Sequence, residues 1–98
     1  MRKIINERLF EWDDEKAKIN KQKHGISFET AAKVFVDENR VEFHDDLHSY
    51  DEDRWQVIGK VNNILFVVYT ERTATRLISA RKATPYERSV YYDSQEMD

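Results

Sequence analysis

The N-terminal part of the chain shows a short strand-like segment followed by a helical pattern. Residues 8–12 place Leu, Phe and Trp between charged side chains, which predicts a short strand. Asp13 stands where a helix N-cap belongs, and residues 14–24 are helix-prone but carry almost no apolar stripe. Gly25 follows as a C-terminal stop. We therefore expect a helix over 14–24 that is largely solvated or serves as a surface.

A second helix is predicted directly afterwards. Ser27 is its N-cap candidate, and the next apolar side chains fall at helical spacing. They are Phe28, Ala31, Ala32 and Phe35. This spacing predicts an amphipathic helix that ends near residues 36–37.

The rest of the chain is typical of a sheet closed by one helix. Residues 40–44 predict an edge strand, and residues 45–53 form an acidic connector that we expect to be flexible. Three segments rich in β-branched and aromatic residues predict further strands at 54–61, 64–71 and 75–82. Thr84 and Glu87 form a capping box around Pro85, which predicts a helix to about residue 94 and a frayed acidic tail over 93–98.

The predicted order is β-α-α-β-β-β-β-α. It indicates an α+β fold in which an antiparallel sheet carries helices mainly on one face. The 98 residues suit a single domain over 1–98, since repeats, linkers and low-complexity tracts are absent from the sequence.

A two-residue turn at Asn62-Asn63 would fix the register of the sheet. It predicts the pairs Lys60–Leu65, Ile58–Val67, Gln56–Tyr69 and Arg54–Glu71. A next turn over residues 72–75 would pair Glu71 with Arg76 and Tyr69 with Ile78. Alternation would place an apolar set toward the helices, namely Trp55, Val57, Val61, Ile64, Phe66, Val68 and Leu77. The other face would gather Arg54, Gln56, Tyr69, Glu71 and Arg76. Arg81 falls on the apolar face in this register unless a bulge precedes it.

Charge and composition narrow the function classes. The net charge of −3 is unevenly spread: residues 1–53 hold 9 Lys and Arg against 14 Asp and Glu, whereas residues 54–92 hold 7 against 2. A basic C-terminal half suits a polyanion. The absence of Cys excludes disulfides, Cys-based zinc sites and thiol nucleophiles. Neither a membrane-length apolar run nor a signal-peptide pattern is present, so we expect a cytoplasmic protein.

Four blocks of residues stand in order along the chain. They are Phe10-Glu11-Trp12-Asp13; Lys23-His24-Gly25-Ile26-Ser27-Phe28-Glu29 with Ala31; Asp53-Arg54-Trp55 with Ile58-Gly59; and Ile78-Ser79-Ala80-Arg81-Lys82-Ala83 with Glu87 and Tyr91. Together they resemble the BrnT-type ribonuclease toxins, the toxin halves of bacterial type II toxin–antitoxin pairs. The resemblance covers residues 10–92.

This resemblance implies a RelE-like α+β fold and a metal-independent endoribonuclease with no cofactor. It also implies a BrnA-like antitoxin that neutralises the toxin and carries the DNA-binding part, so that DNA is contacted only through the complex, with a possible 2:2 assembly. The helices over 14–24 and 84–94 are the expected antitoxin contacts.

Metal-free RNA cleavage uses the ribose 2′-OH as nucleophile and needs a base, an acid and cationic donors on the phosphate. Our candidate catalytic residues are His24, Arg54, Glu71, Arg81 and Tyr91. Our candidate RNA-binding residues are Lys23, Tyr69, Arg76 and Lys82, with Trp55 as another side chain that could stack a base.

Several of these residues also have a structural interpretation. His24 could bond the last carbonyls of its helix, Glu87 could serve only as the capping-box carboxylate, and Tyr91 and Trp55 could be packing aromatics. Arg54 and Arg76 could form cross-strand ion pairs with Glu71 on a solvated face of the sheet.

Two further alternatives concern the whole protein. His44 and His48 are metal-type residues four apart, but their segment is predicted as strand and connector, so we expect no metal site. The chain could also be a non-catalytic module that holds an antitoxin and modulates its binding to an operator. Growth arrest on induction, relieved by Arg81→Ala, would distinguish the nuclease from this module.

Overall fold

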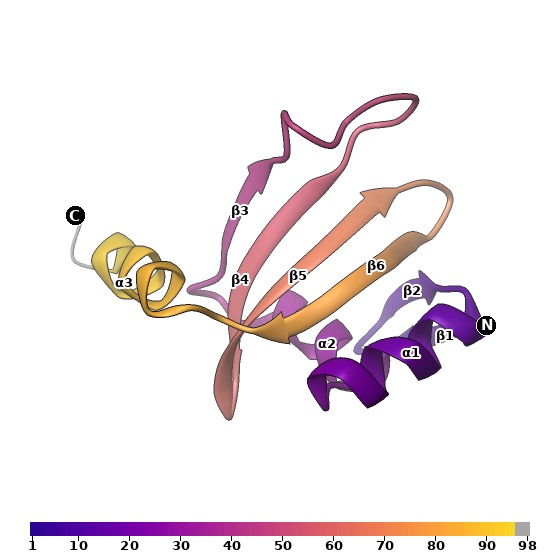
Figure 1. The fold of residues 1–98 in the computed structure, drawn as a ribbon, viewed down its shortest axis with the longest axis horizontal. Coiled ribbons are helices and arrows are strands. Elements are labelled where there is room, and N and C mark those ends of the chain that lie inside the picture. Colours follow the sequence, from indigo (N-terminus) through magenta and orange to yellow (C-terminus); the bar gives the residue numbers. More distant parts are fainter. Residues whose placement is uncertain (96–98) are drawn as a thin grey trace.

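A sheet of six strands forms the centre of the part that the structure describes, residues 1–95 of a computed structural model (Figure 1). Its order is β1-β2-β6-β5-β4-β3, with β2 and β6 parallel and the other neighbours antiparallel. The strands are β1 (Arg2–Ile5), β2 (Arg8–Glu11), β3 (Val41–His44), β4 (Trp55–Val61), β5 (Asn63–Glu71) and β6 (Thr75–Lys82). The helical elements are α1 (Asp14–His24), α2 (Phe28–Ala32), the 3₁₀ helix η1 (Lys33–Val36) and α3 (Pro85–Ser94).

The predicted α+β fold and the element order from residue 8 onward are confirmed. The edge position of β3 is also confirmed. Strand β1 was not predicted, and it pairs with β2 through a hairpin whose two turn residues, Asn6 and Glu7, both have positive φ. Residues 96–98, the end of the predicted frayed tail, lie outside the described residues.

The predicted helix starts, and the predicted end of the first helix at Gly25, are confirmed by their caps. The helix predicted from Ser27 to residues 36–37 is α-helical only to Ala32 and continues as the 3₁₀ helix η1 to Val36. The side chains of Asp13 and Ser27 each accept a hydrogen bond from a backbone N–H in the first turn of their helix. Gly25 ends α1 at φ 73°, a conformation that glycine adopts without strain. Thr84 and Glu87 form the complete capping box of α3.

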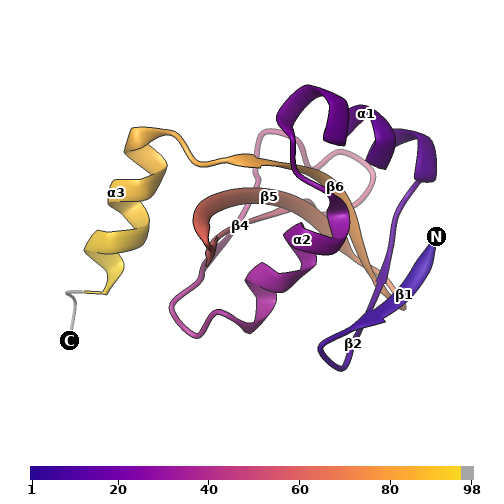
Figure 2. The same cartoon turned by 90° about the horizontal axis from the view of Figure 1, so that it is seen from below.

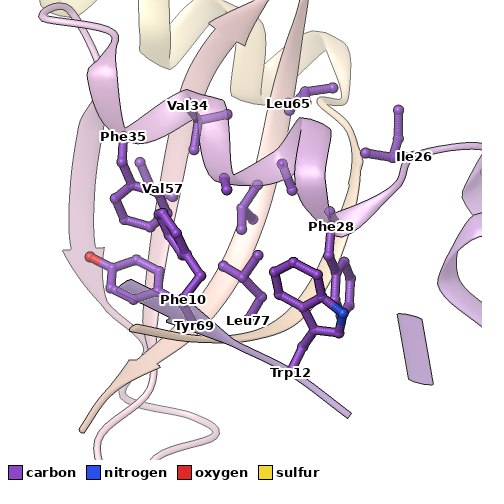
Figure 3. Close-up of a cluster of buried hydrophobic side chains, with 14 residues drawn as sticks. Phe10, Trp12, Ile26, Phe28, Val34, Phe35, Val57, Leu65, Tyr69 and Leu77 are labelled. Carbon is purple, nitrogen blue, oxygen red and sulfur yellow. The ribbon is translucent and has the colours of Figure 1, made fainter. Parts of the chain in front are cut away.

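The main core lies between the sheet and the elements α1, α2 and η1 (Figure 3). Its largest members are Phe10, Trp12, Phe28, Phe35, Val57, Leu65, Val67, Tyr69 and Leu77. The Phe35 and Tyr69 rings meet edge to face with centroids 4.9 Å apart. Trp55, which could have been a base-stacking residue, is half-buried and packs against this core.

A smaller cluster occupies one end of the opposite face. Ile58 and Ile64 lie there with Tyr91, Ala83, Phe43, Phe66 and Val90. Helix α3 packs onto this cluster at one end of the sheet, apart from α1 and α2 (Figures 1 and 2). Because α3 covers only that end, the middle of the outer face, the side away from α2, stays open.

The predicted register between β4 and β5 is wrong by one residue. Val61 pairs with Asn63, and Asn62 alone makes the turn at φ 62°. Lys60 therefore pairs with Ile64 rather than with Leu65. A one-residue slip reverses every side chain of β5, so that the predicted inward set Ile64, Phe66 and Val68 lies on the outer face.

The predicted pairs between β5 and β6 are wrong near their turn. Glu71 pairs with Thr75, and Tyr69 pairs with Leu77. A register shift then occurs between Val68 and Tyr69, beyond which Phe66 pairs with Arg81. This is the bulge that the sequence left open, and it places Arg81 on the outer face beside Phe66.

Helix α1 is fixed by a polar anchor. The buried Asn20 donates to the carbonyls of Ile26 (3.0 Å) and Ala80 (2.9 Å) and accepts from the Ala80 N–H (3.1 Å). Strand β2 pairs with β6 only at Thr75 and Arg76, so the Asn20 amide satisfies backbone groups of β6 beyond the end of β2.

Within residues 1–95, no helix is both long enough and apolar enough to cross a membrane.

Candidate functional site

Two adjoining hollows lie along β6. The first, which we call the arginine hollow, has a volume of about 350 Å³. It is lined by Asp45, His48, Arg54, Gln56, Phe66, Val68, Ile78, Ser79 and Arg81. The second, the lysine hollow, measures about 220 Å³ and is lined by Lys16, Ile19, Asn20, Lys23, His24, Ile78 and Ser79. Because Ile78 and Ser79 line both, the two hollows form neighbouring parts of one surface.

Arg54 and Arg81 bring two guanidinium groups to the arginine hollow. Arg54 directly precedes β4, and no carboxylate within residues 1–95 lies at ion-pair distance from it. Arg81 donates from both terminal nitrogens to Glu87, at 2.7 and 2.9 Å, and its guanidinium carbon lies 4.3 Å from the centroid of the Phe66 ring. Glu87 thus holds Arg81 at the rim while it caps α3.

Arg81 and Glu87 each stabilise the charged form of the other. Burial raises the pKa of the Glu87 carboxyl, but the hydrogen bonds from Arg81 and the Thr84 backbone outweigh it and leave the pKa below its ordinary value. The hydrogen bond to Glu87 raises the pKa of Arg81. Both groups therefore stay charged across the neutral range.

Lys23 and His24 lie in the lysine hollow at the end of α1. The structural alternative for His24 was a bond to the final carbonyls of this helix. Instead, the Lys21 ammonium donates to the Gly25 carbonyl, at 3.3 Å. The His24 imidazole faces the hollow, where it can exchange a proton.

The predicted cluster of Arg54, Gln56, Tyr69, Glu71 and Arg76 does not form. Gln56 does lie beside Arg54 in the arginine hollow. Glu71 instead accepts from Arg8 at 2.7 Å and from Thr75 at 3.1 Å.

Arg76 donates to Glu11 at 2.8 Å, and this bond is the main cause that lowers the pKa of the Glu11 carboxyl. The structure thus places Arg76 in an ion pair at the junction of β2 and β6.

The two predicted tyrosines serve as buried links. Tyr69 donates to Glu42 at 2.6 Å from the main core, and burial is the main cause that raises its pKa. Tyr91 donates to Asp37 at 2.6 Å, and burial again raises the pKa most. Lys82, at the end of β6, is exposed and lines neither hollow.

Sequence reasoning missed a histidine–aspartate pair in the connector. His48 Nδ1 lies 3.1 Å from both carboxylate oxygens of Asp45, and both residues line the arginine hollow. The Ser49 hydroxyl donates to the Asp45 carbonyl and accepts from the Arg54 N–H, so the loop is closed by hydrogen bonds. The spacing of Asp and His three residues apart was visible, but only the folded loop shows which carboxylate His48 contacts.

His44, the last residue of β3, has a separate environment. The two ring nitrogens of His44 contact Asp46 and Asp53, and the hydrogen bond to Asp53 is the main cause that raises its pKa. His44 and His48 therefore bind different carboxylates. Across residues 1–95, no group of three or more His, Asp or Glu side chains has the geometry to hold a metal ion.

The arrangement supplies the groups that phosphodiester cleavage requires. Two guanidinium groups can bind phosphate oxygens, and imidazoles at the edges of both hollows can exchange protons. Arg81 lies on β6 and His24 is the last residue of α1, whereas Arg54 directly precedes β4 and His48 lies in the connector loop.

Comparison with known proteins identifies the family. Residues 12–87 match the family model described as the ribonuclease toxin, BrnT, of type II toxin–antitoxin system. The 1.1 Å crystal structure of the Brucella abortus ribonuclease toxin BrnT is similar, with a TM-score of 0.60 and 26% sequence identity over 74% of this chain and 92% of that chain. A search of curated proteins found no match. This chain therefore belongs to the BrnT family of ribonuclease toxins of type II toxin–antitoxin systems.

Proposed function

We propose that this protein is a metal-independent endoribonuclease toxin, active in the cytoplasm, that cleaves RNA by attack of a ribose 2′-OH on the adjacent phosphate. The observation that carries the proposal is the meeting of Arg54 and Arg81 in one open hollow on the outer face of the sheet. That hollow adjoins a second one with Lys23 and His24. A site of this composition suits an RNA phosphate beside its ribose.

The reaction can be written with these groups in place. The 2′-oxygen bonds to phosphorus as its proton leaves, and the bond from phosphorus to the 5′-oxygen breaks as that oxygen gains a proton. The products are a 2′,3′-cyclic phosphate and a 5′-hydroxyl. Negative charge increases on the phosphoryl oxygens in the transition state, where the guanidinium groups of Arg54 and Arg81 stabilise it. DNA lacks the 2′-OH, so this chemistry selects RNA.

The candidate residues divide by position. We assign phosphate binding to Arg54 and Arg81, substrate attraction to Lys23, and proton donation to the leaving 5′-oxygen to His24. The remaining candidates take other roles in this proposal. Glu71, Tyr91, Tyr69 and Arg76 stabilise the fold through the contacts described above, and Lys82 contributes only long-range charge.

The test compares two arginine variants. Arg54→Ala removes a guanidinium from the hollow, whereas Arg88→Ala removes one from the exposed surface of α3. With purified protein, an RNA oligonucleotide and excess chelator, we expect Arg54→Ala to lower kcat/KM by roughly 10²–10³-fold. The Arg88→Ala control should stay within about threefold of wild type.

Three outcomes would contradict the proposal. They are intact RNA with the wild-type protein, loss of activity on adding chelator, and cleavage of an oligonucleotide with 2′-deoxyribose at the scissile position. Intact RNA together with unchanged growth on induction would favour the non-catalytic module that holds an antitoxin.

Membership of a type II toxin–antitoxin family implies an antitoxin partner. We propose that it is BrnA-like, that DNA is bound only through it, and that the complex is a 2:2 assembly. Helix α1 lines the lysine hollow at Lys23, and α3 is joined to the arginine hollow by the ion pair of Glu87 with Arg81, so an antitoxin laid across both helices would cover the site. Light scattering of the co-expressed pair would give its stoichiometry, and the pair should not cleave RNA.

A further inference from the structure

Of the histidines in the chain, His48 has the geometry of a proton acceptor. We propose that His48 is the catalytic base that takes the 2′-OH proton, with Asp45 as its positioning residue. This inference rests on the proposed nuclease function and adds a catalytic pair to it. Both side chains line the arginine hollow with Arg54 and Arg81, the groups that would hold the phosphate.

The contact between the two side chains orients the imidazole. His48 Nδ1 lies 3.1 Å from each carboxylate oxygen of Asp45, and an ionised carboxylate can only accept. The ring proton is thereby kept on Nδ1, and the lone pair of Nε2 is available to accept a proton. The Asp45 side chain is 7% exposed and that of His48 is 57% exposed, so the anchor is buried while the imidazole is accessible.

The Asp45 carboxylate is itself held in place. Burial raises its pKa, but hydrogen bonds from His48 and Gln56 outweigh this effect and leave the pKa below its ordinary value. Its backbone N–H donates to the Arg54 carbonyl at 2.8 Å, and its carbonyl accepts from Ser49 at 2.7 Å. Asp45 thus stays ionised at neutral pH and stabilises the imidazolium that forms when His48 takes a proton.

The other two histidines lack this arrangement. Both ring nitrogens of His44 contact carboxylates, so neither is available to a substrate. His24 lies in the neighbouring hollow, whose lining contains no carboxylate to orient its ring. His48 alone among the histidines of residues 1–95 combines an anchored Nδ1 with a place beside both arginines.

The charges around His48 fit a base that becomes cationic. In the arginine hollow it faces Asp45, Arg54 and Arg81, and in the hollow on its other side it faces Asp51 and Glu52. The proton moves from the 2′-oxygen to Nε2 while the new oxygen–phosphorus bond forms. The leaving 5′-oxygen takes its proton from His24, so each group transfers one proton per cleavage.

The main experiment compares His48→Gln with Leu47→Ala. Leu47 is the adjacent loop residue, is 80% exposed and lines neither hollow, so its replacement tests for a general effect on the loop. We expect His48→Gln to lower kcat by roughly 10²–10⁴-fold and to flatten the acidic limb of the pH–rate profile. Leu47→Ala should stay within about threefold of wild type. Both variants should bind a 2′-deoxy oligonucleotide as wild type does, which shows that the site is folded.

A second substrate distinguishes a base from an acid. An RNA with sulfur in place of the 5′-bridging oxygen has a leaving group that needs no proton. His48→Gln should remain defective on this substrate, whereas His24→Gln should recover activity. Recovery by His48→Gln would overturn its assignment as the base.

The Asp45 contribution is tested by Asp45→Asn. An amide in this place can donate to Nδ1, which would move the ring proton to Nε2 and remove the acceptor. We expect a lower kcat with KM nearly unchanged, because orientation and not substrate binding is lost. A change in KM alone would overturn the positioning role.

These experiments distinguish a failure of the His48 inference from a failure of the nuclease proposal. If wild type cleaves RNA and His48→Gln cleaves it equally well, the inference is wrong and the nuclease proposal stands. If wild type does not cleave RNA, both are wrong.

Discussion

Replacing Asn20 tests whether a polar contact fixes α1. This helix exposes most of its side chains, and Asn20 is its buried residue. The Asn20→Ala variant removes the three hydrogen bonds to Ile26 and Ala80 and keeps the helical backbone. If the anchor is as important as its burial indicates, the free energy of unfolding should fall well beyond the value typical of a surface substitution.

The magnitude follows from the three bonds. Together they contribute about 3 kcal/mol, at about 1 kcal/mol net each, and a buried group that finds no new partner costs about 1–3 kcal/mol in place of that net value. The stronger helix propensity of Ala returns roughly 0.6 kcal/mol. Because water can enter the adjacent lysine hollow, which Asn20 lines, some of the desolvation cost is relieved. We therefore expect a loss of about 2–4 kcal/mol.

Urea unfolding measures this loss, with an unchanged slope of free energy against denaturant showing that the two states remain comparable. Gln22→Ala is the matched control, since Gln22 is an exposed amide on the same helix. It should change the free energy of unfolding by less than about 0.5 kcal/mol. A loss below about 1 kcal/mol for Asn20→Ala would refute the reasoning that this amide joins α1 to β6.

Three further stability predictions follow from the fold. In Gly59→Ala the new Cβ would lie 2.8 Å from Val34 Cβ, so we expect a loss of about 1–3 kcal/mol and a Tm several degrees lower by calorimetry. Burial raises the pKa of the Asp37 carboxyl, but hydrogen bonds, that from Tyr91 foremost, outweigh it and leave the pKa below its ordinary value of 3.8. The ionised carboxylate therefore stabilises the folded protein above pH 3.8, and this stabilisation is lost as the pH falls through the lower pKa of the folded state. Asp37→Asn should therefore lower Tm at pH 7 and reduce its decline toward pH 3. Thr84→Ala removes the α3 cap and should cost about 1 kcal/mol in urea unfolding, whereas an unchanged midpoint would contradict the capping role.

Local signals made most of the elements predictable. The caps at Asp13, Ser27 and Thr84 act within four residues, and helical spacing needs only one turn to be recognised. These signals do not depend on distant parts of the chain. Strand β1 escaped prediction because its hairpin turn uses Asn6 and Glu7 at positive φ, and Glu7 is not a typical residue for that conformation.

The faces of the sheet were not predictable from pattern alone. Strand β5 is buried on both sides: Leu65 and Val67 face the main core, while Ile64 packs in the second cluster. A continuous apolar run gives no alternation from which the inward face can be chosen, so the register depended entirely on the turn. Asn62 alone at positive φ decided it, and a neighbouring Asn63 made two turns equally plausible.

Residue type identified Arg54 and Arg81 as site candidates, but the side chains that lie beside them depend on contacts between residues far apart in the sequence. The predicted register placed Glu71 beside Arg54 and Arg76, but Glu71 instead pairs with Arg8. His48 was missed although its contacts are local in the sequence. Its position is set by the hydrogen bonds of the connector, which no periodic pattern encodes.

The irregular pairing of β6 explains how one strand contributes to both the core and the site. Leu77 and Arg81 are four residues apart, so a regular strand would point both toward the same face. Leu77 lies in the main core, yet Arg81 lines the arginine hollow. The register shift opposite Val68 and Tyr69 supplies the additional residue that reverses the alternation. Without it, the guanidinium would turn toward apolar side chains, where an unpaired charge is costly. The bulge therefore allows a cationic site to be built on a strand whose other end is buried.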